Sequence, residues 1–117
     1  MKQTILILTL LFTYGSYAQK TEKKLKTSTT FLSVKGVCKM CKNRIEKTAL
    51  KNKGVKYASW NLQSKELHLI YNPNKANKSD ISKSILSIGH DVDTLKATET
   101  AYQKLHACCK YRADSTH

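Results

Sequence analysis

The chain has 117 residues, 40% hydrophobic and 25% charged, and its 21 Lys and Arg against 8 Asp and Glu give a net charge of +13. That length supports one small domain and excludes a large multi-domain enzyme. The excess of positive charge predicts an anionic partner, and nucleic acid is the first class to weigh. Whether the protein encounters nucleic acid depends on the cellular compartment in which it is located.

The first 18 residues have the pattern of a secretory signal peptide. Their start is positively charged, an apolar run covers residues 5–12, and Ser16 and Ala18 place small residues at positions −3 and −1 of a cleavage site. A membrane anchor is disfavoured, because about 20 apolar residues are needed to span a bilayer. We therefore predict cleavage between Ala18 and Gln19 and a periplasmic or secreted protein without a membrane anchor.

Removal of this leader leaves 99 residues with 20 basic and 8 acidic side chains, a net charge of +12. An exported protein of this charge meets little nucleic acid. Its lysines are also scattered along the chain rather than aligned with aromatic side chains on which bases stack. We expect the partner to be a protein with an acidic face, and no nucleic acid.

Residues 19–29 are rich in lysine and predict a solvated, flexible arm. Alternation of apolar and polar side chains from Thr30 predicts a first strand, which Gly36 ends. Apolar residues at helical spacing, Cys41, Ile45 and Ala49, predict a helix that begins at about Met40. Residues 55–62 and 66–71 alternate again, with a short turn between them, and predict a hairpin.

A second helix is predicted between a cap at Asn77 or Ser79 and Gly89, with isoleucines at helical spacing. Residues 90–96 then predict a last strand. The order βαββαβ is typical of an α+β, ferredoxin-like sandwich with a four-stranded antiparallel sheet and two helices on one face. The remaining residues from Thr98 predict a C-terminal helical extension.

Four cysteines form two close pairs, Cys38-x-x-Cys41 and adjacent Cys108-Cys109. Neither spacing is typical of a disulfide framework, although export favours disulfides. Adjacent cysteines are poor disulfide partners, because a disulfide usually needs a Cα separation of about 4.4–6.8 Å and consecutive residues are about 3.8 Å apart. A C-x-x-C pair indicates either a metal site or a redox couple.

The stretch Val34-Lys35-Gly36-Val37-Cys38-Lys39-Met40-Cys41, followed by Arg44-Ile45-Glu46, resembles the heavy-metal-associated domain of copper chaperones and periplasmic mercury-binding proteins. Gly54-Val55 and Ile85-Leu86-Ser87-Ile88-Gly89-His90 match the same family, and the resemblance covers residues 30–97. One departure is that the family usually reads Gly-Met-x-Cys, whereas the loop here is one residue shorter and lacks that methionine. Met40, inside the pair, does not replace it.

Cys38 and Cys41 are the predicted metal ligands. Soft metal ions bind thiolates, and the positive end of the helix macrodipole favours the thiolate at the start of the first helix. Lys39 and Lys42 add positive charge nearby, which favours ionised sulfur and offsets the charge of a two-thiolate centre. Sulfur ligands select Cu(I) or Zn(II) over Mg²⁺ or Ca²⁺. Cu(I) is the first choice, with Zn(II) or Hg(II) as alternatives.

Histidines are further candidates as ligands. In the resembling family the residue after the second helix's terminal glycine lies beside the metal loop, which makes His90 a possible ligand or neighbour of the metal. His68 is expected to face solvent, in the middle of a strand. His106, close to the second cysteine pair, is a minor candidate.

The C-terminal extension, residues 98–117, carries Cys108 and Cys109 outside the ordinary domain. A strand of residues 91–96 travels roughly 20 Å away from the metal loop. A helix from Thr98 to Cys108 covers roughly 16 Å, so one that folds back returns the second pair to the first. This geometry permits a four-sulfur cluster. The alternatives are a floppy tail whose thiols act independently, and a disulfide from the tail to Cys38 or Cys41 in the oxidised protein.

Several functions remain to be weighed. The first is an exported Cu(I) metallochaperone or sequestration protein. A structural zinc site has four protein ligands and no open coordination position, so it needs Cys108, Cys109 or His90 in addition to Cys38 and Cys41. Mercury binding by both cysteine pairs is a related alternative. A thiol–disulfide oxidoreductase is a further alternative. The sequence shows no catalytic constellation and no phosphate-binding loop, so we expect no enzyme.

Overall fold

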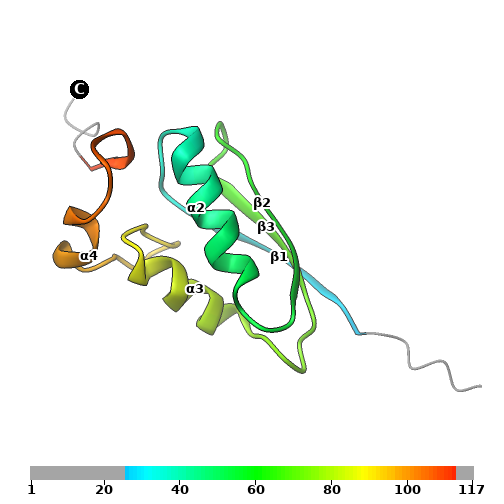
Figure 1. The fold of residues 1–117 in the computed structure, drawn as a ribbon. Coiled ribbons are helices and arrows are strands. Elements are labelled where there is room, and N and C mark those ends of the chain that lie inside the picture. The colour runs from blue at the N-terminus through cyan, green and yellow to red at the C-terminus, as the bar shows by residue number, and fades with distance from the viewer. Residues whose placement is uncertain (1–25, 113–117) are drawn as a thin grey trace, which may run out of the picture.

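A computed structural model describes residues 26–112 of the chain, and the predicted leader and most of the predicted arm lie outside them (Figure 1). The elements in chain order are β1 (Ser28–Ser33), α2 (Lys39–Leu50), β2 (Val55–Trp60), β3 (Glu66–Tyr71), α3 (Lys78–Ser87), α4 (Glu99–Gln103) and the 3-10 helix η2 (Ala107–Cys109). None of the helices in this part of the chain has the length and apolarity needed to cross a membrane.

The strands form an antiparallel sheet in the order β1-β3-β2. Leu67 in the central strand pairs with Leu32 on one side and with Trp60 on the other. Because side chains alternate between the faces of a strand, these three fully buried residues share one face. The helices α2 and α3 cover that face, which places the hydrophobic core between sheet and helices (Figure 1).

Both predicted helices of the domain are confirmed, and their ends follow from local chemistry. Cys41, Ile45 and Ala49 form the buried face of α2. The side chain of Asn77 caps α3 by accepting a hydrogen bond from the backbone N–H of Asp80. After α3, Gly89 has a φ of +102°, a left-handed conformation that favours glycine.

The predicted fourth strand, residues 90–96, is wrong. Only Val92 forms a bridge to the end of β1, through Val34, and the chain then turns so that Val92 also bridges Leu95. Asp93 makes this turn with a φ of +51°, and its carboxylate accepts a hydrogen bond from the Ser33 backbone N–H. The turn ends pairing after one residue, so the described sheet has three strands instead of four.

The C-terminal extension is not the single helix predicted from Thr98 to Cys108. It contains the five-residue α4 and, after an extended residue at His106, the three-residue η2. Thr98 caps α4, with its hydroxyl accepting from the Ala101 backbone N–H. The extension packs closely on the end of α3, because a Cβ added to Gly89 would lie 2.7 Å from the Ala101 carbonyl oxygen.

Candidate metal centre

The loop between β1 and α2 carries the first cysteine pair and is held by Trp60. The indole N–H of Trp60 donates a buried hydrogen bond of 2.9 Å to the Val34 carbonyl oxygen. Gly36 leaves room for this packing, since a Cβ there would lie 3.1 Å from both the Trp60 ring and the Cys41 Cβ. Cys41 is consequently fully buried in the first turn of α2, while Cys38, just before the helix, is half-buried.

The fold brings all four thiols to the start of α2. The sulfur of Cys38 lies 3.4 Å from that of Cys41 and 3.5 Å from those of Cys108 and Cys109. The Cys108 and Cys109 sulfurs are 3.9 Å apart. Cys38, Cys108 and Cys109 have their sulfurs within 4.8 Å of one another, close enough to share a metal ion. All four cysteines carry free thiols.

Cys38 is more readily ionised than the two cysteines of the extension. Burial by itself would raise the pKa of Cys38, but interactions with the backbone N–H of Cys41 and with the thiols of Cys41, Cys109 and Cys108 outweigh it. They lower this pKa from an ordinary 9.0 to about 7. A thiolate is therefore available near neutral pH, as is typical of a cysteine at the start of a helix.

The two cysteines of the extension, Cys108 and Cys109, have raised pKa values. Burial, followed by hydrogen bonding to the sulfurs of Cys41 and Cys38, raises the pKa of Cys109 far above its ordinary value. Hydrogen bonding to Cys38, with a smaller contribution from desolvation, raises the pKa of Cys108. Once one thiol of the group is ionised, ionisation of a second thiol costs more free energy, and a bound cation removes that cost.

Neither Lys39 nor Lys42, the lysines predicted to favour the thiolate, is among the causes of the low pKa of Cys38. The ammonium group of Lys42 donates to the Glu46 carboxylate at 2.6 Å and to the Trp60 carbonyl oxygen at 2.8 Å. Glu46 also accepts from the Trp60 backbone N–H at 2.9 Å. Lys42 therefore fastens α2 to the end of β2 instead of facing the sulfur group.

His90 is fully buried beside the loop, as the resemblance implied, but it is not part of the sulfur group. Its Nδ1 lies 2.7 Å from the Lys35 carbonyl oxygen and must donate, because that oxygen can only accept. Its Nε2 has no hydrogen-bond partner among the described residues. Burial, aided by the positive charge of Arg44, outweighs the Lys35 hydrogen bond and lowers the pKa of His90.

The other two predicted histidines lie apart from the sulfurs. His68 is on the outer face of the sheet, stacked on Phe31 with ring centroids 4.6 Å apart and touched edge-on by Tyr57 at 5.4 Å. His106 is exposed and only its carbonyl oxygen is engaged, by the Cys109 backbone N–H. Neither histidine belongs to the group of thiols that could share a metal ion.

Sequence analysis missed the residues that anchor the extension. The Tyr111 hydroxyl donates to the Gly89 carbonyl oxygen at 2.7 Å and accepts from the Asp91 backbone N–H at 3.0 Å. Arg112 donates to the Asp91 carboxylate at 2.9 Å, and its guanidinium lies 4.4 Å from the Tyr102 ring centroid. The buried aromatics of the extension were the available signal, but their spacing does not identify Asp91 as a partner.

Met40 lies at the edge of the sulfur group. It is exposed, and its Sδ lies 3.8 Å from the Cys108 sulfur. A fifth sulfur therefore borders the thiol group, contributed by a residue between the two cysteines of the loop.

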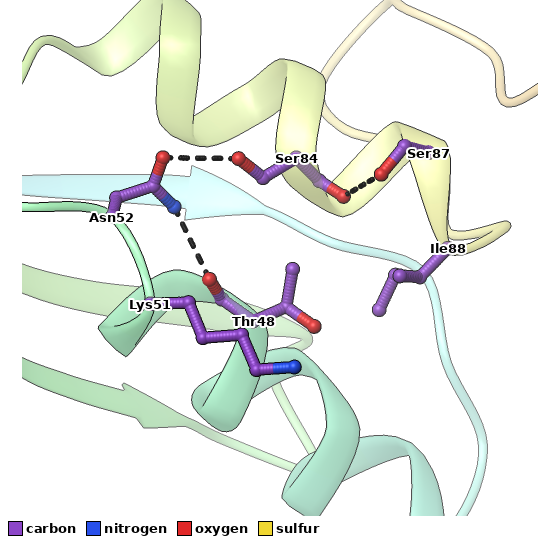
Figure 2. Close-up of a pocket in the computed structure, with 6 residues that line it drawn as sticks. All are labelled: Thr48, Lys51, Asn52, Ser84, Ser87 and Ile88. Atoms are coloured by element: carbon purple, nitrogen blue, oxygen red, sulfur yellow. Dashed lines mark hydrogen bonds between the residues drawn. The ribbon is translucent and has the colours of Figure 1, made fainter.

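A different hollow lies between the ends of α2 and α3 (Figure 2). Asn52 holds the two helices together there, because its side chain donates to the Thr48 carbonyl oxygen at 3.1 Å and accepts from the Ser84 hydroxyl at 3.0 Å. The hollow contains hydroxyls, an amide and one lysine, and its six lining residues include no cysteine, histidine or carboxylate. It lies at the opposite end of α2 from the sulfur group and provides no metal ligands comparable to the thiols.

The sequence profile of the heavy-metal-associated domain matches residues 31–91. A copper-exporting P-type ATPase from Staphylococcus saprophyticus is 34% identical over 88 residues, which cover 74% of this chain and 11% of that protein. This chain thus spans about a tenth of the length of the curated relative that it matches.

Solved structures with the same fold include proteins described as copper-binding. A CopZ metallochaperone is 30% identical with a TM-score of 0.55, and the match covers 56% of this chain and all of that one. The Cu(I)-loaded N-terminal domain of a potential copper-translocating P-type ATPase from Bacillus subtilis is 28% identical with a TM-score of 0.56, covering 63% and 94% of the two chains. Oxidised MerP from Ralstonia metallidurans, at 22% identity and a TM-score of 0.56 over 58% and 96%, shares the fold.

Proposed function

Since the chain belongs to the heavy-metal-associated domain family, we propose that it is an exported Cu(I)-binding protein, a metallochaperone or sequestration protein, with Cys38 and Cys41 as ligands. The observation that carries this proposal is the thiol pair at the start of α2, with sulfurs 3.4 Å apart. The low pKa of Cys38, about 7, supplies a thiolate at neutral pH. The copper-exporting ATPase and the Cu(I)-loaded ATPase domain among the relatives support Cu(I) over Zn(II) and Hg(II). Export rests on the pattern of the first 18 residues.

Metal titration of the reduced mature chain under anaerobic conditions tests the proposal. Cu(I) supplied from a chromophoric chelator should bind tightly to the parent, and Cys38→Ser with Cys41→Ser should abolish tight binding, because oxygen is a poor ligand for Cu(I). Asn43→Ser, exposed on the same helix, is the matched control and should bind as the parent does. Unchanged affinity in the double cysteine variant would overturn the proposal.

The partner that we propose is a metal-donating or metal-accepting protein with an acidic face. Lys39 is exposed beside Cys38, and Arg44 is half-buried on the following turn. Positive charge around the thiols attracts an acidic surface and speeds encounter. We propose no reaction for the chain beyond binding and transfer of the metal.

A thiol–disulfide oxidoreductase is the second candidate, because the low pKa of Cys38 and its 3.4 Å separation from Cys41 also suit a redox couple. Reduction of insulin by the reduced chain at catalytic rates would favour this candidate over metal binding. Its absence together with tight Cu(I) binding would leave the metal function alone.

A further inference from the structure

We propose that Cys108 and Cys109 bind the same soft-metal ion as Cys38. The metal is then held by at least three sulfurs, and Cys41 lies on the buried side of this site. This inference rests on the proposed function of Cys38 and Cys41. It goes further because it assigns the C-terminal extension to the site and predicts a closed sulfur shell instead of an open two-sulfur one.

Cys38 has a different position from the other thiols. Its sulfur is within 3.5 Å of all three others, whereas the group whose sulfurs are all mutually close contains Cys38, Cys108 and Cys109. Cys38 is therefore shared between the loop pair and the pair in the extension. A metal bound to Cys38 has both cysteines of the extension within reach.

The spacing of the sulfurs fits a closed shell. At a metal–sulfur bond of about 2.3 Å, two ligand sulfurs lie about 4.6 Å apart in linear, about 4.0 Å apart in trigonal and about 3.8 Å apart in tetrahedral coordination. The three distances within the group are 3.5, 3.5 and 3.9 Å. They are closer to the trigonal and tetrahedral values than to the linear one.

The extension is held in place by contacts that do not involve the sulfurs. Cys109 is fully buried, and Leu105 and Tyr111 are nearly so. The Tyr111 hydroxyl bonds to the backbone of Gly89 and Asp91 just after α3. Cys38 and Cys108 are 70 residues apart in sequence, yet the fold has already brought them together. Metal binding therefore does not bear the full entropy cost of ordering the extension.

A shell of three or four thiolates defines the class of metal and its exchange. It suits a thiophilic d¹⁰ cation, Cu(I) or Zn(II), and leaves little open coordination space. The thiolates of an acceptor protein must then displace the extension before they reach the metal. The extension therefore favours retention of the metal, and its displacement is the step that permits transfer. In Figure 1 the orange-red segment that contains η2 lies near the start of α2.

The decisive experiment counts sulfur ligands by X-ray absorption on the mature chain loaded with Cu(I), and in a second arm with Zn(II). The parent should show three or four sulfurs per metal, and Cys108→Ser with Cys109→Ser should show two with Cu(I). Affinity for Cu(I) should fall about tenfold or more, because two tethered ligands are lost. Ala107→Ser, exposed in the same 3-10 helix, is the matched control and should match the parent.

Cys108→Ser alone separates loss of a ligand from misfolding of the extension, because Cys108 is exposed whereas Cys109 is buried. It should remove one sulfur from the shell with the far-UV spectrum unchanged. Tyr111→Phe keeps every cysteine but removes the hydroxyl that anchors the extension, so it should lower the sulfur count and the affinity together. Tyr57→Phe, on the exposed outer face, is its control.

The single variants of the loop provide an independent test. Because Cys38 is shared by both pairs, Cys38→Ser should weaken Cu(I) binding more than Cys41→Ser does. A two-sulfur site predicts equal losses instead. Two sulfurs in the parent, with no change in Cys108→Ser and Cys109→Ser, would overturn the inference and leave the proposed function intact. Tight binding without both Cys38 and Cys41 would overturn the proposed function itself.

Discussion

The loop at the start of α2 and the C-terminal extension both deliver cysteines to the sulfur group, but they are held by different forces. Cys41 belongs to a 12-residue helix whose buried face packs on the sheet beside Trp60. Cys109 belongs to a three-residue 3-10 helix, η2, and depends on polar contacts of Tyr111 and Arg112 with the segment after α3. Burial of a long helix on the sheet fixes the first pair, whereas the second depends on burial of Cys109 together with hydrogen bonds of Tyr111 and Arg112.

This difference predicts different responses to damage. Loss of apolar contacts near the loop should unfold the domain as a unit, because the loop shares its core. Loss of polar anchors should release the extension while the domain stays folded, because a short terminal segment outside the sheet opens at lower free energy than the elements of the core. The following variants are ordered from the largest expected effect to the smallest.

Trp60→Ala should be the most damaging change, at about 3–5 kcal/mol of unfolding free energy, because a large buried side chain leaves a cavity. Trp60 is fully buried and also donates to the Val34 carbonyl oxygen. Urea unfolding followed by far-UV circular dichroism measures the loss. Tyr57→Ala, 46% exposed on the outer face of the sheet, is the control and should cost about 1 kcal/mol or less. Equal losses in the two variants would show that the loop does not depend on Trp60.

Asp91→Asn should have a smaller effect, about 1–3 kcal/mol for a hydrogen-bonded buried charge, and should act mainly on the extension. The Asp91 carboxylate accepts from the Ala97 backbone N–H at 2.8 Å and from Arg112 at 2.9 Å. The variant should expose Cys109 to alkylation at neutral pH with little change in Cys41. Mass spectrometry of alkylated peptides from the metal-free chain measures both thiols.

The stabilisation contributed by the Asp91 carboxylate should also decrease at acidic pH. Burial alone would raise the pKa of Asp91, but hydrogen bonds from the Ala97 backbone N–H and from Arg112, with the positive charge of Arg112, lower it below the ordinary 3.8. The stabilisation is therefore present above pH 3.8 and is lost as the pH falls through the lower folded-state pKa. The stability difference between the parent and Asp91→Asn should shrink over that acidic range. A difference that grows on acidification would contradict the assignment.

The smallest effect concerns the relative reactivity of the two thiol pairs and leaves stability unchanged. Because the pKa of Cys38 is about 7, its alkylation by iodoacetamide should reach half its maximal rate near pH 7. Cys108 is more exposed, but its raised pKa should make it slower at that pH. Cys41→Ala should shift the Cys38 rate profile toward higher pH, since the side-chain hydrogen bond that favours the thiolate is lost. Faster alkylation of Cys108 than of Cys38 at pH 7 would contradict the predicted difference between the pKa values of these two thiols.

Periodicity and capping predicted the domain's two helices because both signals are local. The buried positions Cys41, Ile45 and Ala49 and the cap at Asn77 lie where the sequence indicates. The fourth strand was predicted wrongly because the apolar residues Val92 and Leu95 suggest alternation, whereas the backbone at Asp93 turns and pairs them with each other. Likewise, the charge of Lys42 was visible in sequence, but its hydrogen bond to the Trp60 carbonyl oxygen, 18 residues away, was not.

The sequence by itself determined the family, the helical start at the C-x-x-C pair and the presence of a second cysteine pair in an extension. These features depend on residue type and on short spacings, which a chain carries regardless of its surroundings. Only the tertiary structure decided that Cys38 lies within 3.5 Å of Cys108 and Cys109. That proximity depends on the turn at Asp93 and on Tyr111 bonding across to Gly89, contacts between residues far apart in sequence.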